Sequence, residues 1–173
     1  MSVNLSVREL QEPGLVERVA ETLRGSGLEP AALTLEITET SMVEDAEDTL
    51  STLHALRGLG VRLAIDDFGT GYSSLSYLRR LPVDVLKLDR SLVASSGLGD
   101  RDAALVEAVF RLGRDLGLQT IVEGVEEPQQ RARLVALGCE LGQGFLFARP
   151  MDAAAATDEL RRLRGEDAGR AIA

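Results

Sequence analysis

The chain has 173 residues, 45% of them hydrophobic, which is enough to bury one core and predicts a single domain. Its formal charge of −9 argues against broad contact with polymeric DNA or RNA, and no apolar run approaches the roughly 20 residues of a membrane span. A single cysteine, Cys139, excludes a disulfide framework, and the first ten residues lack the basic and apolar regions of a secretory signal. The composition therefore predicts a cytoplasmic protein.

Strands and helices are predicted to alternate along the chain. Short apolar runs indicate strands at residues 1–7, 33–38, 63–65, 83–88, 119–125 and 139–147. Apolar residues at helical spacing indicate helices at residues 13–24, 44–57, 102–116, 128–138 and 152–164, with a short helical turn near 74–80. The remaining residues, 165–173, are expected to form a frayed, disordered tail, so the predicted domain covers residues 1–164.

Polar residues fall at or near the carboxyl end of each predicted strand. They are Asn4, Glu36, Asp66, Lys87, Glu123 and Gln143. In an α/β barrel all these ends converge on one face, whereas a doubly wound sheet gathers its ligands at one switch point. A complete barrel needs eight strands and about 250 residues. The pattern therefore predicts an incomplete TIM-type (β/α) barrel of about six parallel strands with outer helices.

The segment Arg62–Leu75 joins a buried strand to two adjacent carboxylates and then to a polar loop with two glycines. Asp66 and Asp67 would repel each other and raise one pKa unless a cation lies between them, and a divalent metal is the simplest such cation. An Asp-Asp helix cap followed by a glycine turn is the alternative explanation of the same residues.

An oxygen-rich site is indicated by these carboxylates, an amide and a lysine. Such ligands suit Mg²⁺ or Mn²⁺ rather than zinc, and two such cations bridged by carboxylates commonly hydrolyse phosphodiesters. In such a site Lys87 would bind a phosphate oxygen or orient the water. The only histidine, His54, is predicted to be a surface or packing residue, and Cys139 a small buried residue at the start of a strand.

Five stretches of the sequence resemble the ordered motifs of one known family. They are VNLSVREL (3–10), LEITET (35–40), DDFGTGYSSLSYLRRLPVDVLKLDRSLV (66–93), IVEGVE (121–126) and GCELGQGFLFARP (138–150). The family is that of the EAL-type phosphodiesterases, which linearise the bacterial second messenger cyclic di-GMP. The resemblance implies a site with two Mg²⁺ or Mn²⁺ ions. It implies Asn4, Glu36 and Asp66 as ligands of one metal, and it places Asp67 and Glu123 with the second metal and its water.

The same resemblance implies roles for further residues. Lys87 matches a lysine beside the catalytic water, which makes Lys87, Glu123 and Asp67 the expected catalytic residues. Asp89 and Gln143 match substrate-binding positions. Glu39 and Glu126 resemble glutamates that support the glycine loop, and in relatives this loop couples the site to dimerisation. A homodimer through the Asp67–Leu75 region is therefore expected.

The sequence departs from the family pattern in one respect. The family is named for a Glu-Ala-Leu tripeptide whose glutamate binds a metal, and none of the 173 residues forms it. The expected function is hydrolysis of cyclic di-GMP to linear pGpG, impaired in this chain. The alternative is a catalytically inactive module that binds cyclic di-GMP or another protein, and a different barrel phosphohydrolase is a third hypothesis. Either a cut gene or a natural remnant would leave open sheet edges that need covering.

Overall fold

One parallel sheet organises the chain in a computed structural model, which describes residues 1–38, 46–70, 78–92 and 100–170. Its six strands are β1 (Ser2–Asn4), β2 (Thr34–Thr38), β3 (Arg62–Phe68), β4 (Val85–Leu88), β5 (Gln119–Val122) and β6 (Leu141–Gly142). They neighbour one another in sequence order, and every pair is parallel. A doubly wound sheet would reverse its order at a switch point, so the barrel-type winding is confirmed. Within the described residues β1 and β6 are the two edges of this sheet, and the barrel is incomplete.

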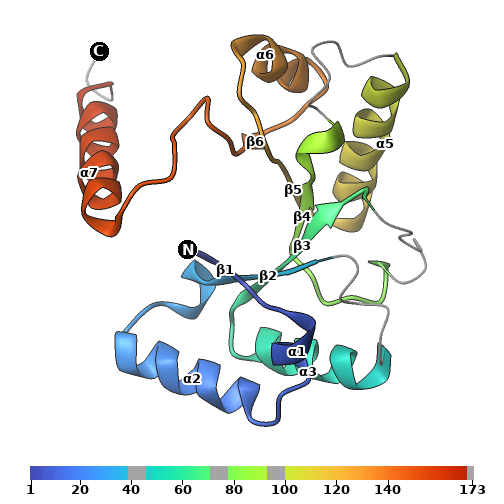
Figure 1. Cartoon of the computed structure of the whole chain (residues 1–173), viewed down its shortest axis with the longest axis vertical. Coiled ribbons are helices and arrows are strands. Elements are labelled where there is room, and N and C mark those ends of the chain that lie inside the picture. Colours follow the sequence, from blue (N-terminus) through green and yellow to red (C-terminus); the bar gives the residue numbers. More distant parts are fainter. Residues whose placement is uncertain (39–45, 71–77, 93–99, 171–173) are drawn as a thin grey trace.

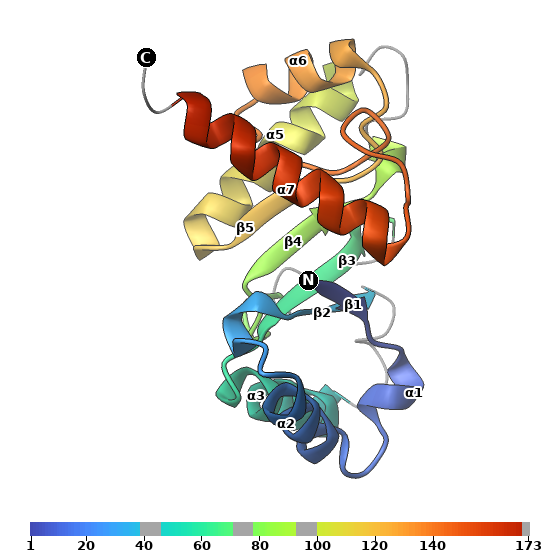
Figure 2. The same ribbon diagram turned by 90° about the vertical axis from the view of Figure 1, so that its left-hand side faces the viewer.

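Helices flank the sheet in two groups (Figures 1 and 2). They are α1 (Val7–Leu10), α2 (Leu15–Ser26), α3 (Ala46–Gly58), α5 (Asp100–Leu116), α6 (Pro128–Ala136) and α7 (Ala153–Arg170). Helices α1 to α3 lie beside the first strands, α5 lies beside β4 and β5, α6 lies near β6, and α7 stands apart from the other helices in Figure 1. No helix in the described part of the chain is both long and apolar enough to cross a bilayer.

The core lies between the central strands and the helices that cover them. Leu63 and Leu86 of the sheet, Leu53 and Leu56 of α3, and Phe110 of α5 are each at most 1% exposed. All four residues of β4 are buried, as expected for a parallel strand covered on both faces. This packing fixes the strand ends on which the polar side chains lie.

The first strand ends earlier than the sequence analysis predicts. Strand β1 stops at Asn4 because Ser6 begins helix α1 with a capping box. The Ser6 hydroxyl accepts from the Glu9 backbone N–H at 3.3 Å, and Glu9 Oε2 accepts from the Ser6 N–H at 2.9 Å. The prediction of strand through Val7 was wrong, although the Ser-x-x-Glu pattern was present in the sequence.

The last strand and the last helix also differ from their predicted lengths. Strand β6 covers only Leu141–Gly142 rather than residues 139–147, because the chain turns at Gly144, whose carbonyl accepts the Phe147 N–H at 3.0 Å. Helix α7 covers Ala153–Arg170, whereas the sequence predicts that the last helix ends at residue 164. The domain boundary at residue 164 and the disordered tail after it stay predictions. The turn predicted near 74–80 falls largely outside the described residues.

Candidate active site

A β-bulge brings the two adjacent aspartates to one site. The β3–β4 ladder pairs Ile65 with Leu86 and then Phe68 with Leu88, so Asp66 and Asp67 together lie opposite the single residue Lys87. Successive side chains of a regular strand point to opposite faces, and a bulge re-aims them. Asp67 takes the left-handed conformation, with a φ of 56°. This local irregularity explains how two neighbours in sequence can serve one site.

Lys87 lies at the centre of a group of three acids, of which Glu36 is buried and Asp66 and Glu123 are partly buried. Its Nζ is 2.6 Å from Glu36 Oε2, 3.0 Å from Asp66 Oδ1 and 2.6 Å from Glu123 Oε1. The three carboxylates come from β2, from β3 and from the residue that follows β5, while Lys87 belongs to β4. Lys87 with these three carboxylates is called the Lys87 cluster below. Only 4% of the Lys87 side chain is exposed, so this ion pairing is shielded from water.

Three carboxylates of the site could hold a metal ion. Asp66, Asp67 and Glu123 each offer an oxygen within 4.8 Å of the others. A donor set made only of oxygen fits hard divalent cations. Glu36 is not one of these three carboxylates, but it contacts the same Lys87 ammonium as Asp66 and Glu123. Asn4 lies opposite Glu36 in the β1–β2 ladder, on the exposed edge strand.

The charges of the site are unbalanced toward the negative. Burial raises the pKa of Glu123, the Lys87 hydrogen bond and charge lower it in part, and the nearby Asp66 and Glu36 carboxylates raise it further, so that it lies above its ordinary value. Burial likewise raises the pKa of Asp67, and the neighbouring Asp66 carboxylate raises it further. Burial alone would lower the pKa of Lys87, but its carboxylate hydrogen bonds raise it above its ordinary value. Burial is thus the main cause of the raised pKa of the two acids, whereas hydrogen bonds to carboxylates are the cause for Lys87.

The raised pKa of Glu123 predicts a pH effect on stability in chelator. Ionising this carboxyl costs more in the folded than in the unfolded protein, so its contribution to stability falls as pH rises from 4.5 toward the folded pKa. The free energy of unfolding of the wild type relative to Glu123→Gln should therefore decrease over that interval. Urea unfolding of both proteins at a series of pH values measures the difference. A difference that grows with pH would contradict the stated electrostatics.

Other predicted site residues are placed by the structure as follows. Asp89 follows β4, and although burial raises its pKa, hydrogen bonds led by that of Ser91 lower it below its ordinary value. Gln143 directly follows β6 and is exposed, and its backbone N–H donates to the Val122 carbonyl at 2.8 Å. Glu126 is exposed near the end of the loop after Glu123. The substrate and support roles of these residues stay predictions.

Some residues named in the sequence analysis lie away from the Lys87 cluster, and others fall outside the residues that the structure describes. Glu39 and the 71–75 part of the glycine loop fall outside the described residues. His54 is exposed on α3. Cys139 is half-buried, with its thiol donating to the Leu141 carbonyl at 3.1 Å, and burial raises its pKa.

Gly124 is a positioning residue that the sequence analysis missed. It follows Glu123 directly and has a φ of 67°, a conformation that side chains rarely adopt. A Cβ at this position would also meet Cβ of Arg90. The glycine thus permits the tight turn that leaves Glu123 beside Lys87, and a lone glycine after a predicted strand was the available signal.

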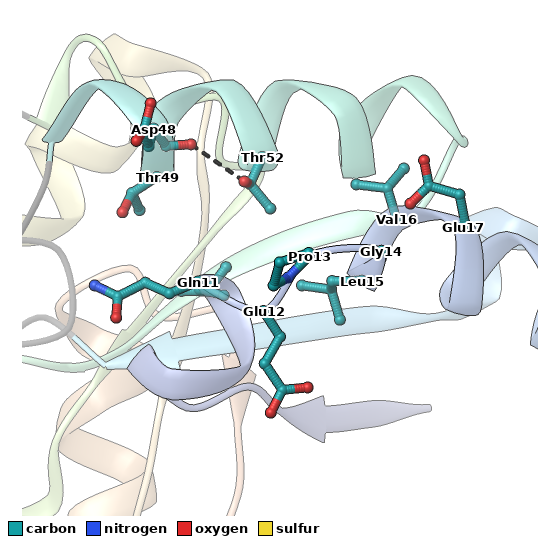
Figure 3. A pocket seen from close by; sticks show the side chains of 11 residues that line it. Gln11, Glu12, Pro13, Gly14, Leu15, Val16, Glu17, Asp48, Thr49 and Thr52 are labelled. Atoms are coloured by element: carbon teal, nitrogen blue, oxygen red, sulfur yellow. Dashed lines mark hydrogen bonds between the residues drawn. The ribbon is translucent and has the colours of Figure 1, made fainter.

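A separate surface pocket of about 430 Å³ lies between the α1–α2 connection and α3 (Figure 3). It is lined by residues 10–17 together with Asp48, Thr49 and Thr52, and the Thr52 hydroxyl donates to the Asp48 carbonyl at 3.1 Å. None of the carboxylates near Lys87 lines it. This pocket is therefore separate from the carboxylates at the strand ends.

Comparison with known proteins identifies the family. Residues 1–150 match the EAL domain family. The chain belongs to the EAL domain family. The cyclic di-GMP phosphodiesterase NbdA of Pseudomonas aeruginosa is 44% identical over 164 residues, covering 95% of this chain and 21% of NbdA. The chain thus spans about a fifth of the length of NbdA and of MucR, a second curated relative.

Solved EAL structures share the fold. The phosphodiesterase MucR of Pseudomonas aeruginosa, in complex with cyclic di-GMP, has a TM-score of 0.84 and 46% identity, covering 90% of this chain and 69% of that one. BlrP1 of Klebsiella pneumoniae, with manganese and cyclic di-GMP, has a TM-score of 0.81 and 39% identity, covering 86% and 38%. The six parallel strands and helices of the present chain therefore correspond to part of an EAL barrel.

Proposed function

We propose that this EAL domain acts in the metal-dependent hydrolysis of cyclic di-GMP to linear pGpG. The observation that carries the proposal is the group of Asp66, Asp67 and Glu123 oxygens around one place at the carboxyl ends of parallel strands, with Lys87 beside it. The substrate is supported by the names of two relatives: NbdA is a cyclic di-GMP phosphodiesterase, and MucR is a bifunctional diguanylate cyclase and cyclic di-GMP phosphodiesterase. The manganese in the BlrP1 complex supports the kind of cofactor.

Each side chain has a distinct proposed task. The metal-binding residues for Mg²⁺ or Mn²⁺ are Asn4, Glu36, Asp66, Asp67 and Glu123. Such cations, when bound, supply an activated water and neutralise charge on the phosphodiester. Lys87 has its ammonium within reach of the same oxygens and would donate an N–H to a phosphate oxygen or to the water. Asp89 and Gln143 are proposed to contact the substrate, and Glu39 and Glu126 to support the glycine loop.

The proposal is tested by chromatographic detection of pGpG from cyclic di-GMP in Mg²⁺ or Mn²⁺. Asp66→Asn should abolish the activity, because it removes a carboxylate shared by Lys87 and the proposed metal. A matched control is Glu107→Gln, which removes an acid from an exposed ion pair on α5 and should leave the rate unchanged. An active Asp66→Asn variant would contradict the assigned site.

A catalytically inactive role is the second candidate function. The Glu-Ala-Leu tripeptide that supplies a metal ligand in the family does not occur among the 173 residues, which favours a module that binds cyclic di-GMP or a protein without hydrolysis. Binding of cyclic di-GMP in calorimetry without formation of pGpG would favour this candidate.

We further propose that the chain forms a homodimer. Support comes from exposed apolar side chains at the open edges, where Val3 of β1 is 44% exposed and Phe147, beyond β6, is 52% exposed. The Asp67–Leu75 region is the other proposed contact. Sedimentation equilibrium at micromolar concentration should give the mass of a dimer, and Val3→Glu should weaken it. A monomer at this concentration would contradict the proposal.

We also propose that residues 1–164 form the domain. We propose, in addition, that the protein is located in the cytoplasm. The free thiol of Cys139 supports the location, because reduced cysteines are usual in reducing compartments.

A further inference from the structure

Lys87 is the only lysine among the 19 basic residues of the chain, and the other 18 are arginines. Its side chain is among the few charged groups that the described residues bury, with an exposure of 3% for the whole residue. An ammonium has three N–H donors and no acceptor. Contacts to Glu36, Asp66 and Glu123 therefore use every donor that Lys87 has.

These three carboxylates have little other compensation within the described residues. Glu36 is a buried acid whose described partner is Lys87 at 2.6 Å. Asp66 Oδ1 accepts from Lys87 at 3.0 Å and from the Asp67 N–H at 3.1 Å. Removing one partner of a buried ion pair leaves an uncompensated buried charge, which is strongly destabilising. Lys87 is thus needed to hold these acids close together.

The carboxylates that could bind a divalent cation overlap with those that Lys87 binds. Asp66 and Glu123 belong to both groups, whereas Asp67 belongs to the metal group alone. A cation held by Asp66 and Glu123 would lie a few ångströms from the ammonium, and two positive charges so close repel each other. Binding of the two cations to these oxygens is therefore coupled, and the coupling is unfavourable.

We propose that Lys87 is the built-in counterion of this site: it holds Glu36, Asp66 and Glu123 together without a divalent cation, and it loses part of its hydrogen bonding when one binds. The second half rests on the metal site of the proposed function, whereas the first half stands without it. Lys87 would then lower the affinity for divalent cations while keeping the acids in position to receive them. In this respect Lys87 is a positioning residue as well as a candidate catalytic one.

The first experiment compares Lys87→Met with the wild type by thermal unfolding in chelator and in Mg²⁺. In chelator the unfolding midpoint of Lys87→Met should fall by roughly 10 °C, because three carboxylates lose their shared cation. Mg²⁺ should raise the midpoint of the variant more than that of the wild type. The matched control is Arg57→Met, which breaks the half-exposed pair of Arg57 with Asp84 and should shift the midpoint by less than about 2 °C.

A second measurement does not depend on the variant folding. Protein labelled with ¹⁵N in lysine alone gives one side-chain nitrogen signal in NMR, that of Lys87 Nζ. In chelator its Nζ protons should be protected from exchange with water, and Mg²⁺ should shift the signal and reduce the protection.

The outcomes separate this inference from the proposed function. An Nζ signal in chelator that exchanges like free lysine, or an unchanged midpoint of Lys87→Met, overturns the counterion role. If calorimetry shows that Mg²⁺ binds and the Nζ signal does not change, the coupling is overturned. No binding of Mg²⁺ at all overturns the coupling and the metal part of the proposed function, while the measurements in chelator still decide the counterion role.

Discussion

The 173-residue chain is expected to form pGpG at no more than about a thousandth of the rate of a complete EAL domain, roughly 4 kcal/mol of lost transition-state stabilisation. The reason is the missing Glu-Ala-Leu glutamate, which the family resemblance makes a metal ligand. Losses in the groups that merely orient metal ligands typically cost about 10- to 100-fold in affinity or activity, so the loss of a ligand itself should cost more. The open edges β1 and β6 add a second cost, because Asn4 lies on one of them.

Adding the missing part of the barrel should restore the rate. A hybrid that adds to this chain the part of the MucR phosphodiesterase domain that it does not match would supply further barrel strands, since the chain covers 69% of that structure. The hybrid should turn over cyclic di-GMP with Mg²⁺ or Mn²⁺, and Asp66→Ala or Glu123→Ala within it should abolish turnover. Full turnover by the chain alone would show that the absent glutamate is dispensable or replaced. The assignment of the first metal site would then be wrong.

Replacing Phe110 by alanine is expected to destabilise the protein by about 3–5 kcal/mol, the usual cost of removing a buried aromatic side chain. Phe110 is only 1% exposed, and it packs from α5 into the single core that also holds β4 and β5. Loss of its ring leaves a cavity beside the strands that carry Lys87 and precede Glu123. Urea unfolding monitored by circular dichroism measures the change.

Phe145 provides the matched control for this substitution. It is the same residue type but 49% exposed, with the Arg149 guanidinium 4.8 Å from the centre of its ring. Phe145→Ala should therefore cost less than about 1 kcal/mol, the usual size of an exposed contact of this kind. Equal losses at both positions would show that α5 does not pack as the structure has it.

The order and type of the strands and helices could be predicted from the sequence, because the apolar patterns that indicate them are long and regular. Apolar runs such as the one that ends at Ile65, alternating with amphipathic helices such as the one containing Val106 and Phe110, predicted parallel βα units, and the sequential strand order confirmed them. Strand ends were harder to predict, because short local contacts decide them. The Ser6–Glu9 capping box shortened β1, and the turn at Gly144 shortened β6.

The site was predictable in its members but less so in its geometry. Four members of the site were identified in the sequence from their positions at predicted strand ends, and the structure brings them into contact. They are Glu36, Asp66, Lys87 and Glu123. That Lys87 would bind all three acids did not follow from the sequence, because it depends on side-chain direction in the folded sheet. The bulge at Asp67 and the left-handed turn at Gly124 were missed for the same reason.

The bulge in β3 also means that spacing along the chain, and not residue identity alone, encodes this site. Between the paired residues Ile65 and Phe68 the chain has two residues where β4 has one. Shortening β3 by one residue there would bring the ladder back into regular register and leave a single side chain facing Lys87. An insertion or deletion at this point is thus a different kind of change from a substitution, because it alters how many acids the strand can present. Sequence comparisons or designs that keep an aspartate here but lose the extra residue would keep the strand and lose the paired carboxylates.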